Sequence, residues 1–232
     1  MGFYLILMGP QGAGKGVQAG FIRQDHGNIP HISTGDLFRA MKTRTDAFAQ
    51  EIQAILASGK LVSDEITCKM VEERLAQPDA HAGALFDGFP RTIPQAEWLE
   101  KYLSAKGEKI AAALLLELDL YDAFRRTFGR VTGADGSSYN IYSNSEGITW
   151  NWVDHESKAF PPRLEATVTA TGEKLARRAD DASADAIIKR LDAFQRDTAP
   201  LLPYYEQRNL LRRVDAAQSI EAVTAAIRKI LG

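Results

Sequence analysis

Short apolar runs alternate with amphipathic stretches along the 232-residue chain. The runs FYLILM (3–8), ALFDGF (84–89) and AAALLLEL (111–118) predict buried parallel strands, because each is continuously apolar and bounded by turn residues or charges. Further strand candidates are LLRRVD (210–215) and NIPHIS (28–33). Helical patterns lie at 14–25, 36–58, 64–76, 94–106, 183–198 and 218–231. This alternation predicts an α/β fold with a parallel sheet covered by helices on both faces.

Residues 131–172 interrupt the alternation. The segment is rich in Gly, Ser, Thr, Asn and aromatic residues, and the alternation in YNIYS and ITWNWV predicts small antiparallel strands. An interruption of this length is typical of a separate lobe rather than a bare loop. We therefore expect an inserted lid here, and a smaller helical insertion over roughly 33–62.

Composition narrows the possible function classes. Apolar residues make up 45% of the chain and charged residues 25%, as in ordinary globular proteins. The net charge of −2 favours neither nucleic acid nor membrane, so any anion site needs a local basic cluster. The single cysteine, Cys68, excludes an intramolecular disulfide and a cysteine-based zinc cluster. No apolar stretch is long enough to span a membrane, and the N-terminal run lacks the basic flank of a signal peptide, so we expect a cytoplasmic protein.

The stretch GPQGAGKGVQ directly follows the first predicted strand. Its G-x-x-G-x-G-K spacing is that of a phosphate-binding loop, in which backbone N–H groups surround phosphate oxygens and Lys15 reaches the terminal phosphates. The general form of this loop has Ser or Thr after the lysine as a Mg²⁺ ligand. Here Gly16 and Val17 follow, and neither carries a hydroxyl. A glycine turn with a stray lysine is the alternative interpretation.

Two further stretches carry candidate phosphate-binding residues. In HISTGDLFR (31–39), a helix N-terminus with Arg39 nearly one turn inside can bind a phosphate, although Ser33, Thr34 and Asp36 also suit simple capping. In FDGFPRTIPQA (86–96), Asp87 ends a predicted parallel strand, where ligands bind in such sheets, and its carboxylate could hold Mg²⁺ through waters. Arg91 follows on the same edge. The alternative for this stretch is an Asp-Gly turn with a surface arginine.

Arginines gather on either side of the predicted lid, in FRRTFGR (124–130), LARRADD (175–181) and KR (189–190). Phosphoryl transfer needs such cations, because charge spreads over the oxygens of the transferred group in the transition state. Taken singly, each arginine is typical of a solvated face or an ion pair. Asp180 and Asp181 could pair with these arginines or cap the following helix.

Together these motifs resemble the adenylate kinase family. The residues that carry the resemblance are GPQGAGKG, STGDLFR, ASGKLVSDE, DGFPRTIPQA, FGR, RRADD and TAPLLPYY, in the expected order over nearly the whole chain. The resemblance implies reversible transfer of the γ-phosphoryl group from Mg-ATP to AMP, giving two ADP, by a monomer with no nucleic-acid or membrane partner. A related kinase with another donor or acceptor (GTP:AMP or UMP/CMP) and a nucleotide-binding scaffold without turnover remain alternatives.

The resemblance also implies a P-loop nucleoside triphosphate hydrolase-type three-layer α/β fold. Its core would comprise 1–32, 63–129 and 179–232, with a small helical AMP-binding lobe at 33–62 and a β-rich lid at 130–178 that closes over the site. Zinc is not expected, because the lid lacks the family's zinc cysteines and their usual polar substitutes. The aromatic residues Tyr139, Tyr142, Trp150, Trp152 and Phe160 are a hypothetical source of order in such a lid.

Carried over position by position, the resemblance assigns three overlapping sets of residues. The ATP set is Gly12, Ala13, Gly14, Lys15, Gly16, Val17, Arg130, Ser138, Tyr139 and Gln218. The AMP set is Thr34, Arg39, Lys60, Leu61, Val62, Gly88, Phe89, Pro90, Arg91, Gln95, Arg178 and Arg190, with Gln95 reading the adenine edge. The set acting on the transferred phosphoryl group is Lys15, Arg91, Arg126, Arg130, Arg178 and Arg190, and Asp87 would hold Mg²⁺ in its outer shell.

Three departures from the family pattern bear on these assignments. Val17 stands where the family usually has Thr, so a side-chain contact is lost there. Ala216 stands where Gly is usual, which weakens Gln218 as an ATP contact. The spacing from Arg178 to Arg190 is one residue longer than the family pattern leads us to expect. This leaves Arg177 and Arg178 as alternatives for one phosphate contact.

Overall fold

The computed structural model describes residues 2–58, 62–154, 156, 162–178, 181 and 183–232. Its contacts divide the chain into two compact units. The first unit comprises Met1–Pro10, Gly14–Leu118 and Ala193–Gly232, and the second comprises Gln11–Ala13 and Asp119–Asp192. Within the described residues, no helix combines the length and apolar character that crossing a membrane requires.

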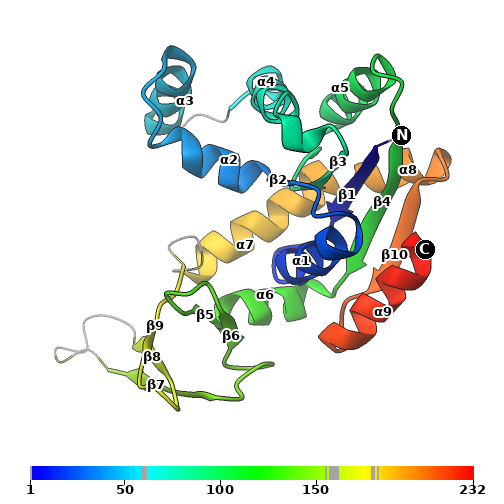
Figure 1. Cartoon of the computed structure of the whole chain (residues 1–232). Coiled ribbons are helices and arrows are strands. Elements are labelled where there is room, and N and C mark those ends of the chain that lie inside the picture. The colour runs from blue at the N-terminus through cyan, green and yellow to red at the C-terminus, as the bar shows by residue number, and fades with distance from the viewer. Residues whose placement is uncertain (1, 59–61, 155, 157–161, 179–180, 182) are drawn as a thin grey trace. The chain divides into compact units, whose positions relative to one another are not determined.

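The first unit is built on a parallel sheet of five strands (Figure 1). The strands are β1 (Phe3–Met8), β2 (His31–Ser33), β3 (Gly83–Asp87), β4 (Ile110–Glu117) and β10 (Leu211–Asp215), in the order β10-β4-β1-β3-β2. Every neighbouring pair is parallel, so all five carboxyl ends lie at one edge. Each predicted strand is confirmed, with shifts of one to three residues at some ends.

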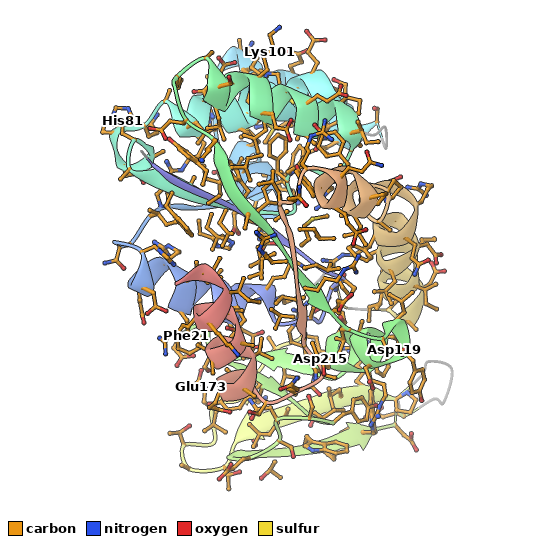
Figure 2. The ribbon with its side chains drawn as sticks, turned by 90° about the vertical axis from the view of Figure 1, so that its right-hand side faces the viewer. Phe21, His81, Lys101, Asp119, Glu173 and Asp215 are labelled. Atoms are coloured by element: carbon orange, nitrogen blue, oxygen red, sulfur yellow. The ribbon has the colours of Figure 1, made fainter. Side chains whose placement is uncertain are left out.

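Helices cover both faces of this sheet. The helices of the first unit are α1 (Lys15–Asp25), α2 (Thr34–Met41), α3 (Ala47–Ala57), α4 (Asp64–Leu75), α5 (Ile93–Ser104), α8 (Leu201–Gln207) and α9 (Ile220–Leu231), with a 3₁₀ turn η1 (Pro78–Ala80) and a π-helical turn η3 (Phe194–Thr198). Figure 2 shows α1, marked by Phe21, with α9 on one face, and α5, marked by Lys101, on the other. Strand residues such as Phe86 pack with Leu99 of α5 and Tyr205 of α8 in one buried core. The predicted α/β class is confirmed.

The helix predicted over 36–58 is instead two helices, α2 and α3. Asp46 begins the second one, because its side chain accepts a hydrogen bond from the backbone N–H of Ala49 at 3.1 Å. A capped N-terminus of this kind starts a new helix rather than continuing the old one. Helix α8 was not predicted; its Pro203 lies in the first turn, where no backbone N–H donor is required.

The second unit contains α6 (Leu120–Phe128), α7 (Ala184–Ala193, whose last residue belongs to the first unit) and two small antiparallel sheets. One sheet pairs β5 (Arg130–Thr132) with β6 (Ser138–Asn140), and the other orders β7 (Ile148–Val153), β8 (Arg163–Val168) and β9 (Lys174–Leu175). The expected antiparallel strands are confirmed. The lid boundaries 130–178 and the 33–62 lobe remain predictions.

The core of the β-rich segment is aliphatic. It consists of Val131, Ile141, Ile148, Ala166 and Leu175, with Tyr139 packed against it. The hypothesis of an aromatic cluster is wrong for Tyr142, Trp150 and Trp152, which are 42%, 36% and 38% exposed. Trp152 instead stacks on Phe128 of α6, with ring centroids 6.0 Å apart. Phe160 lies outside the described residues.

This aliphatic core predicts that the segment is stabilised by packing. We expect Ile141→Ala to lower its free energy of unfolding by about 2–5 kcal/mol, because Ile141 is 4% exposed and its loss leaves a cavity. Ile188→Ala, at a 48% exposed position, is the control. Hydrogen exchange of residues 130–178 would measure both effects, and added EDTA should change neither protein. Faster exchange in EDTA would contradict an order based on packing alone.

Candidate active site

The glycine loop connects β1 to α1. Gly14 adopts a left-handed conformation (φ 85°) directly before α1, which begins at Lys15. The Lys15 ammonium donates hydrogen bonds to the carbonyls of Gly9 at 2.9 Å and Pro10 at 3.0 Å. The lysine therefore folds back across the loop at the N-terminus of a helix. The ammonium and the helix dipole favour an anion at the same place.

Gly12 lies where no side chain fits. Its φ is +89°, and a Cβ there would lie 2.6 Å from the carbonyl oxygen of Ala123 and 2.9 Å from Thr127 Oγ1. These atoms belong to α6, in the same unit as Gly12. Gly16 differs, since a Cβ there would meet nothing within 4 Å. The loop therefore needs glycine at Gly12 for steric reasons.

We expect Gly12→Ala to lower the free energy of unfolding by about 1–3 kcal/mol through backbone strain alone, with the clash against α6 adding to it. Gly16→Ala is the matched control, and it should leave stability unchanged or slightly raised, because alanine suits a helix better than glycine. Urea unfolding of the two variants measures the difference. Equal stabilities would contradict the close approach of the loop to α6.

A second set of polar groups converges on the carbonyl of Gly88, just after β3. Thr34 Oγ1 donates to this oxygen at 2.8 Å, and Arg91 Nε donates to it at 2.9 Å. Thr34, at the start of α2, is only 2% exposed, and Gly88 has a φ of 71°. The turn after β3 thus holds the predicted Thr34 and Arg91 side chains around one point. Phe89 and Pro90 continue this turn.

Gln95 is 5% exposed and fixed at both ends of its amide. Its Oε1 accepts from the backbone N–H of Arg91 at 2.8 Å, and its Nε2 donates to Asp64 Oδ1 at 2.6 Å. Thr92 Oγ1 donates to the other oxygen of Asp64 at 2.7 Å. Each end of the Gln95 amide can make one more hydrogen bond. Asp64 was not among the predicted site residues, although S-D-E after ASGKLV indicates an acidic first helical turn.

Asp87 ends β3 at the carboxyl edge of the sheet, 3.3 Å from Nε2 of His31 on β2. Burial alone would raise the pKa of Asp87, but His31, Lys15 and Arg91 together hold that pKa below the usual aspartate range. The carboxylate is therefore charged at neutral pH. A single carboxylate suits contact with a hydrated metal ion better than direct chelation. Among the described residues, no three His, Cys, Asp or Glu side chains gather as metal ligands.

The remaining predicted AMP-side residues differ in burial. Arg39 lies on the exposed side of α2 and pairs with Asp36 one turn earlier. Arg91 is also exposed at the surface, although partial desolvation lowers its pKa, an effect that the nearby Asp87 and Asp197 oppose. Val62 is half-buried just before α4, and Lys60 and Leu61 lie outside the described residues.

In the second unit, the carboxylate of Asp181 is completely buried and receives four hydrogen bonds. Arg130 donates from Nη2 at 2.6 Å and from Nε at 2.9 Å, and Arg190 donates from Nη1 at 3.2 Å. Gln11 Nε2 donates at 2.7 Å. A buried charge is tolerated when it is paired in this way. The alternative pairing role predicted for Asp181 is therefore the one observed, with Arg130 and Arg190.

Arg177 is held by main-chain groups. Its Nη2 donates to the carbonyls of Phe128 at 3.0 Å and Asp181 at 2.7 Å, and its guanidinium lies 4.7 Å from the Phe128 ring centroid. The two carbonyls belong to residues on either side of the β-rich segment. Arg178, the next residue, is exposed. The geometry thus gives Arg177 a structural task.

Comparisons with known proteins agree with this geometry. The family profile for adenylate kinase matches residues 7–210. The adenylate kinase of Moorella thermoacetica is 42% identical to the chain, over 98% of the chain and 97% of its own length. That of Carboxydothermus hydrogenoformans is 40% identical over 98% of both chains. That of Clostridium acetobutylicum is 39% identical over 98% of both chains. The chain belongs to the adenylate kinase family. The predicted family and the predicted phosphotransferase class are confirmed.

The remaining residues assigned from the family resemblance lie on several different elements. Arg126 occupies the last turn of α6. Ser138 and Tyr139 lie on β6, opposite Thr132 and Val131 of β5. In the first unit, exposed Gln218 follows β10, and its Nε2 donates to Asp215 at 3.2 Å.

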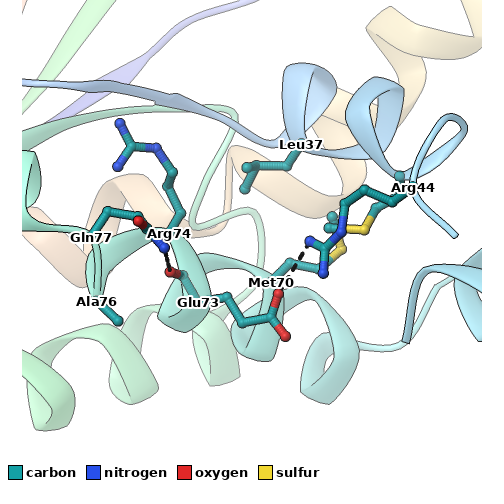
Figure 3. A pocket seen from close by; sticks show the side chains of 8 residues that line it. Leu37, Arg44, Met70, Glu73, Arg74, Ala76 and Gln77 are labelled. Carbon is teal, nitrogen blue, oxygen red and sulfur yellow. Dashed lines mark hydrogen bonds and ion pairs between the residues drawn. The ribbon is translucent and has the colours of Figure 1, made fainter. Parts of the chain in front are cut away.

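A hollow of about 620 Å³ lies between α2 and α4 (Figure 3). Leu37, Met41 and Met70 give it an apolar floor, and Arg44 bridges to Glu73 at 3.2 Å beside it. None of the residues assigned from the family resemblance lines it. The candidate active site of this adenylate kinase family member therefore does not include this hollow.

Proposed function

We propose that this chain reversibly transfers the γ-phosphoryl group of Mg-ATP to AMP, giving two ADP. The observation that carries the proposal is a pair of anion-binding arrangements after neighbouring parallel strands. Lys15 and the glycine loop follow β1, and the Thr34–Gly88–Arg91 arrangement follows β3. Two such arrangements suit a reaction that transfers a phosphoryl group from one nucleotide to another. The names and near full-length similarity of the relatives also support it.

In the proposed reaction, an oxygen of the AMP phosphate attacks the γ-phosphorus, and the bond to the β–γ bridging oxygen breaks to release ADP. The chain supplies positioning and charge neutralisation rather than covalent chemistry. The glycine loop from Gly12 to Val17, with Ser138, Tyr139 and Gln218, would hold ATP. Thr34, Arg39, Gly88–Arg91 and Gln95 would hold AMP, and the cations at the transferred group would be Lys15, Arg91, Arg126, Arg130, Arg178 and Arg190.

Asp87 is the residue proposed to hold Mg²⁺ through water. Its charged carboxylate at the carboxyl edge of the sheet fits this role, and the absence of a hydroxyl at Gly16 and Val17 leaves the loop without a side-chain ligand. The bound metal would neutralise charge on the ATP phosphates. We further propose that residues 130–178 close over the nucleotides and exclude water, so that AMP is the acceptor. We propose a cytoplasmic monomer without a nucleic-acid partner, consistent with free nucleotides as substrates.

The test is a coupled assay of ADP formation with Mg-ATP or Mg-GTP as donor and AMP, CMP, UMP or GMP as acceptor. We expect rapid turnover with Mg-ATP and AMP. Mg-GTP is included because Ala216 and the Asp215-bound Gln218 alter the region expected to read the donor base. Preference for GTP would favour a related kinase. Tight ATP binding without turnover for any pair would overturn the proposal.

A further inference from the structure

The side chain of Gln11 has a partner far away in the sequence. It occupies one of the unspecified positions of the G-x-x-G-x-G-K spacing, where phosphate binding through backbone N–H groups sets no requirement on the side chain. Its Nε2 donates to Asp181 Oδ1 at 2.7 Å. Its Oε1 is buried and has no hydrogen-bond partner among the described residues. The amide is thus oriented for the carboxylate while its oxygen goes unsatisfied, which normally carries an energetic penalty.

The two oxygens of Asp181 have different partners. Oδ2 accepts both hydrogen bonds from Arg130, whereas Oδ1 accepts the short bond from Gln11 and a longer one, 3.2 Å, from Arg190. A carboxylate can rotate about its Cβ–Cγ bond unless both oxygens are held. Gln11 makes the shorter of the two bonds to Oδ1, so it restrains this rotation together with Arg190 and Arg130. The orientation of the carboxylate in turn sets where the two guanidinium groups lie.

We propose that Gln11 is a positioning residue for phosphoryl transfer, acting through Asp181 on Arg130 and Arg190. The inference rests on the proposed function of these two arginines as phosphate contacts. Because Gln11 belongs to the glycine loop, one hydrogen bond ties the backbone that binds the donor phosphates to the carboxylate that orients the cations. Its role differs from that of the loop glycines, which allow close approach of the backbone.

Two substitutions of Gln11 test the proposal. Gln11→Met keeps the length of the side chain but cannot donate. A hydrogen bond to a charged group that acts in the transition state is worth about tenfold or more in rate, so we expect kcat to fall about tenfold with little change in KM for AMP. Matched changes at Gln207, exposed at the end of α8, should leave kcat unchanged. Thermal unfolding of each variant separates this effect from loss of structure.

Gln11→Glu provides a pH-dependent readout. The new carboxylate would face Asp181, with the cations Arg130, Arg190 and Arg177 on the other sides of that residue. A like charge raises the pKa of the new glutamate, so it is protonated and able to donate only at lower pH. We expect kcat of Gln11→Glu, divided by that of the unaltered enzyme, to be lowest near pH 8 and to rise as the pH falls to about 5.5. Gln207→Glu should give a flat ratio.

The outcomes separate the inference from the proposed function. A flat ratio for Gln11→Glu, or unchanged kcat for Gln11→Met, would overturn the inference. So would strictly additive effects of Gln11→Met and Asp181→Asn in a double-mutant cycle, because residues acting through one hydrogen bond must be coupled. Arg130→Lys and Arg190→Lys test the underlying assignment. If these two variants keep full kcat, it is the proposed role of the arginines that fails.

Discussion

Replacing Lys15 with methionine is expected to lower kcat about a hundredfold to a thousandfold, the usual effect of removing one charge-stabilising group from a preorganised site. The ammonium lies at the N-terminus of α1 inside the glycine loop. In the proposed function it stabilises the negative charge on the transferred phosphoryl group. Methionine keeps the apolar stem but removes the charge. Steady-state assays with Mg-ATP and AMP would measure the change.

The fold should survive this substitution. Lys15 donates to the carbonyls of Gly9 and Pro10, and each such hydrogen bond contributes only about 1 kcal/mol to stability. Lys101→Met, on the exposed side of α5, is the control, and its kcat should be unchanged. If Lys15→Met retained kcat within twofold while unfolding at the normal temperature, the lysine would have no role in the chemical step.

The parts of the fold that could be predicted from sequence are those that local pattern determines. A strand buried on both faces must be apolar throughout, as Tyr4–Met8 are, so the central sheet was identifiable from short runs. The glycine loop was identifiable because its spacing is a steric requirement, visible here in the contact of Gly12 with α6. Both signals lie within about ten consecutive residues.

The remaining features depend on partners distant in the sequence. Gln11 and Asp181 are separated by 170 positions, and no local spacing pairs them. Asp64 and Gln95 lie 31 positions apart, so the role of Asp64 in holding the amide could not be inferred from its helix-capping motif. Tyr142, Trp150 and Trp152 were misassigned to the core of the β-rich segment because composition alone does not tell which face of a strand is covered.

The contacts of Arg177 bear on the choice between Arg177 and Arg178 as the proposed phosphate contact. Arg177 Nη2 is committed to the carbonyls of Phe128 and Asp181. Burial lowers its pKa, opposed by Asp181 and Tyr142. A guanidinium that leaves these carbonyls to reach a phosphate would leave them without this donor, which carries a desolvation penalty. Arg178 is therefore the better candidate for the phosphate contact.

We accordingly expect Arg178→Met to lower kcat about a hundredfold to a thousandfold, because the proposed contact with a phosphate would be lost. Arg177→Met should mainly affect stability. It should lower the unfolding temperature and speed hydrogen exchange of residues 128–132 and 174–178, while kcat stays within about threefold, because its contacts are to the main chain and to Phe128. The two variants are matched controls for each other. A large loss of kcat in Arg177→Met with normal stability would instead assign the phosphate contact to Arg177, and its bonds to Phe128 and Asp181 would then have to break during turnover.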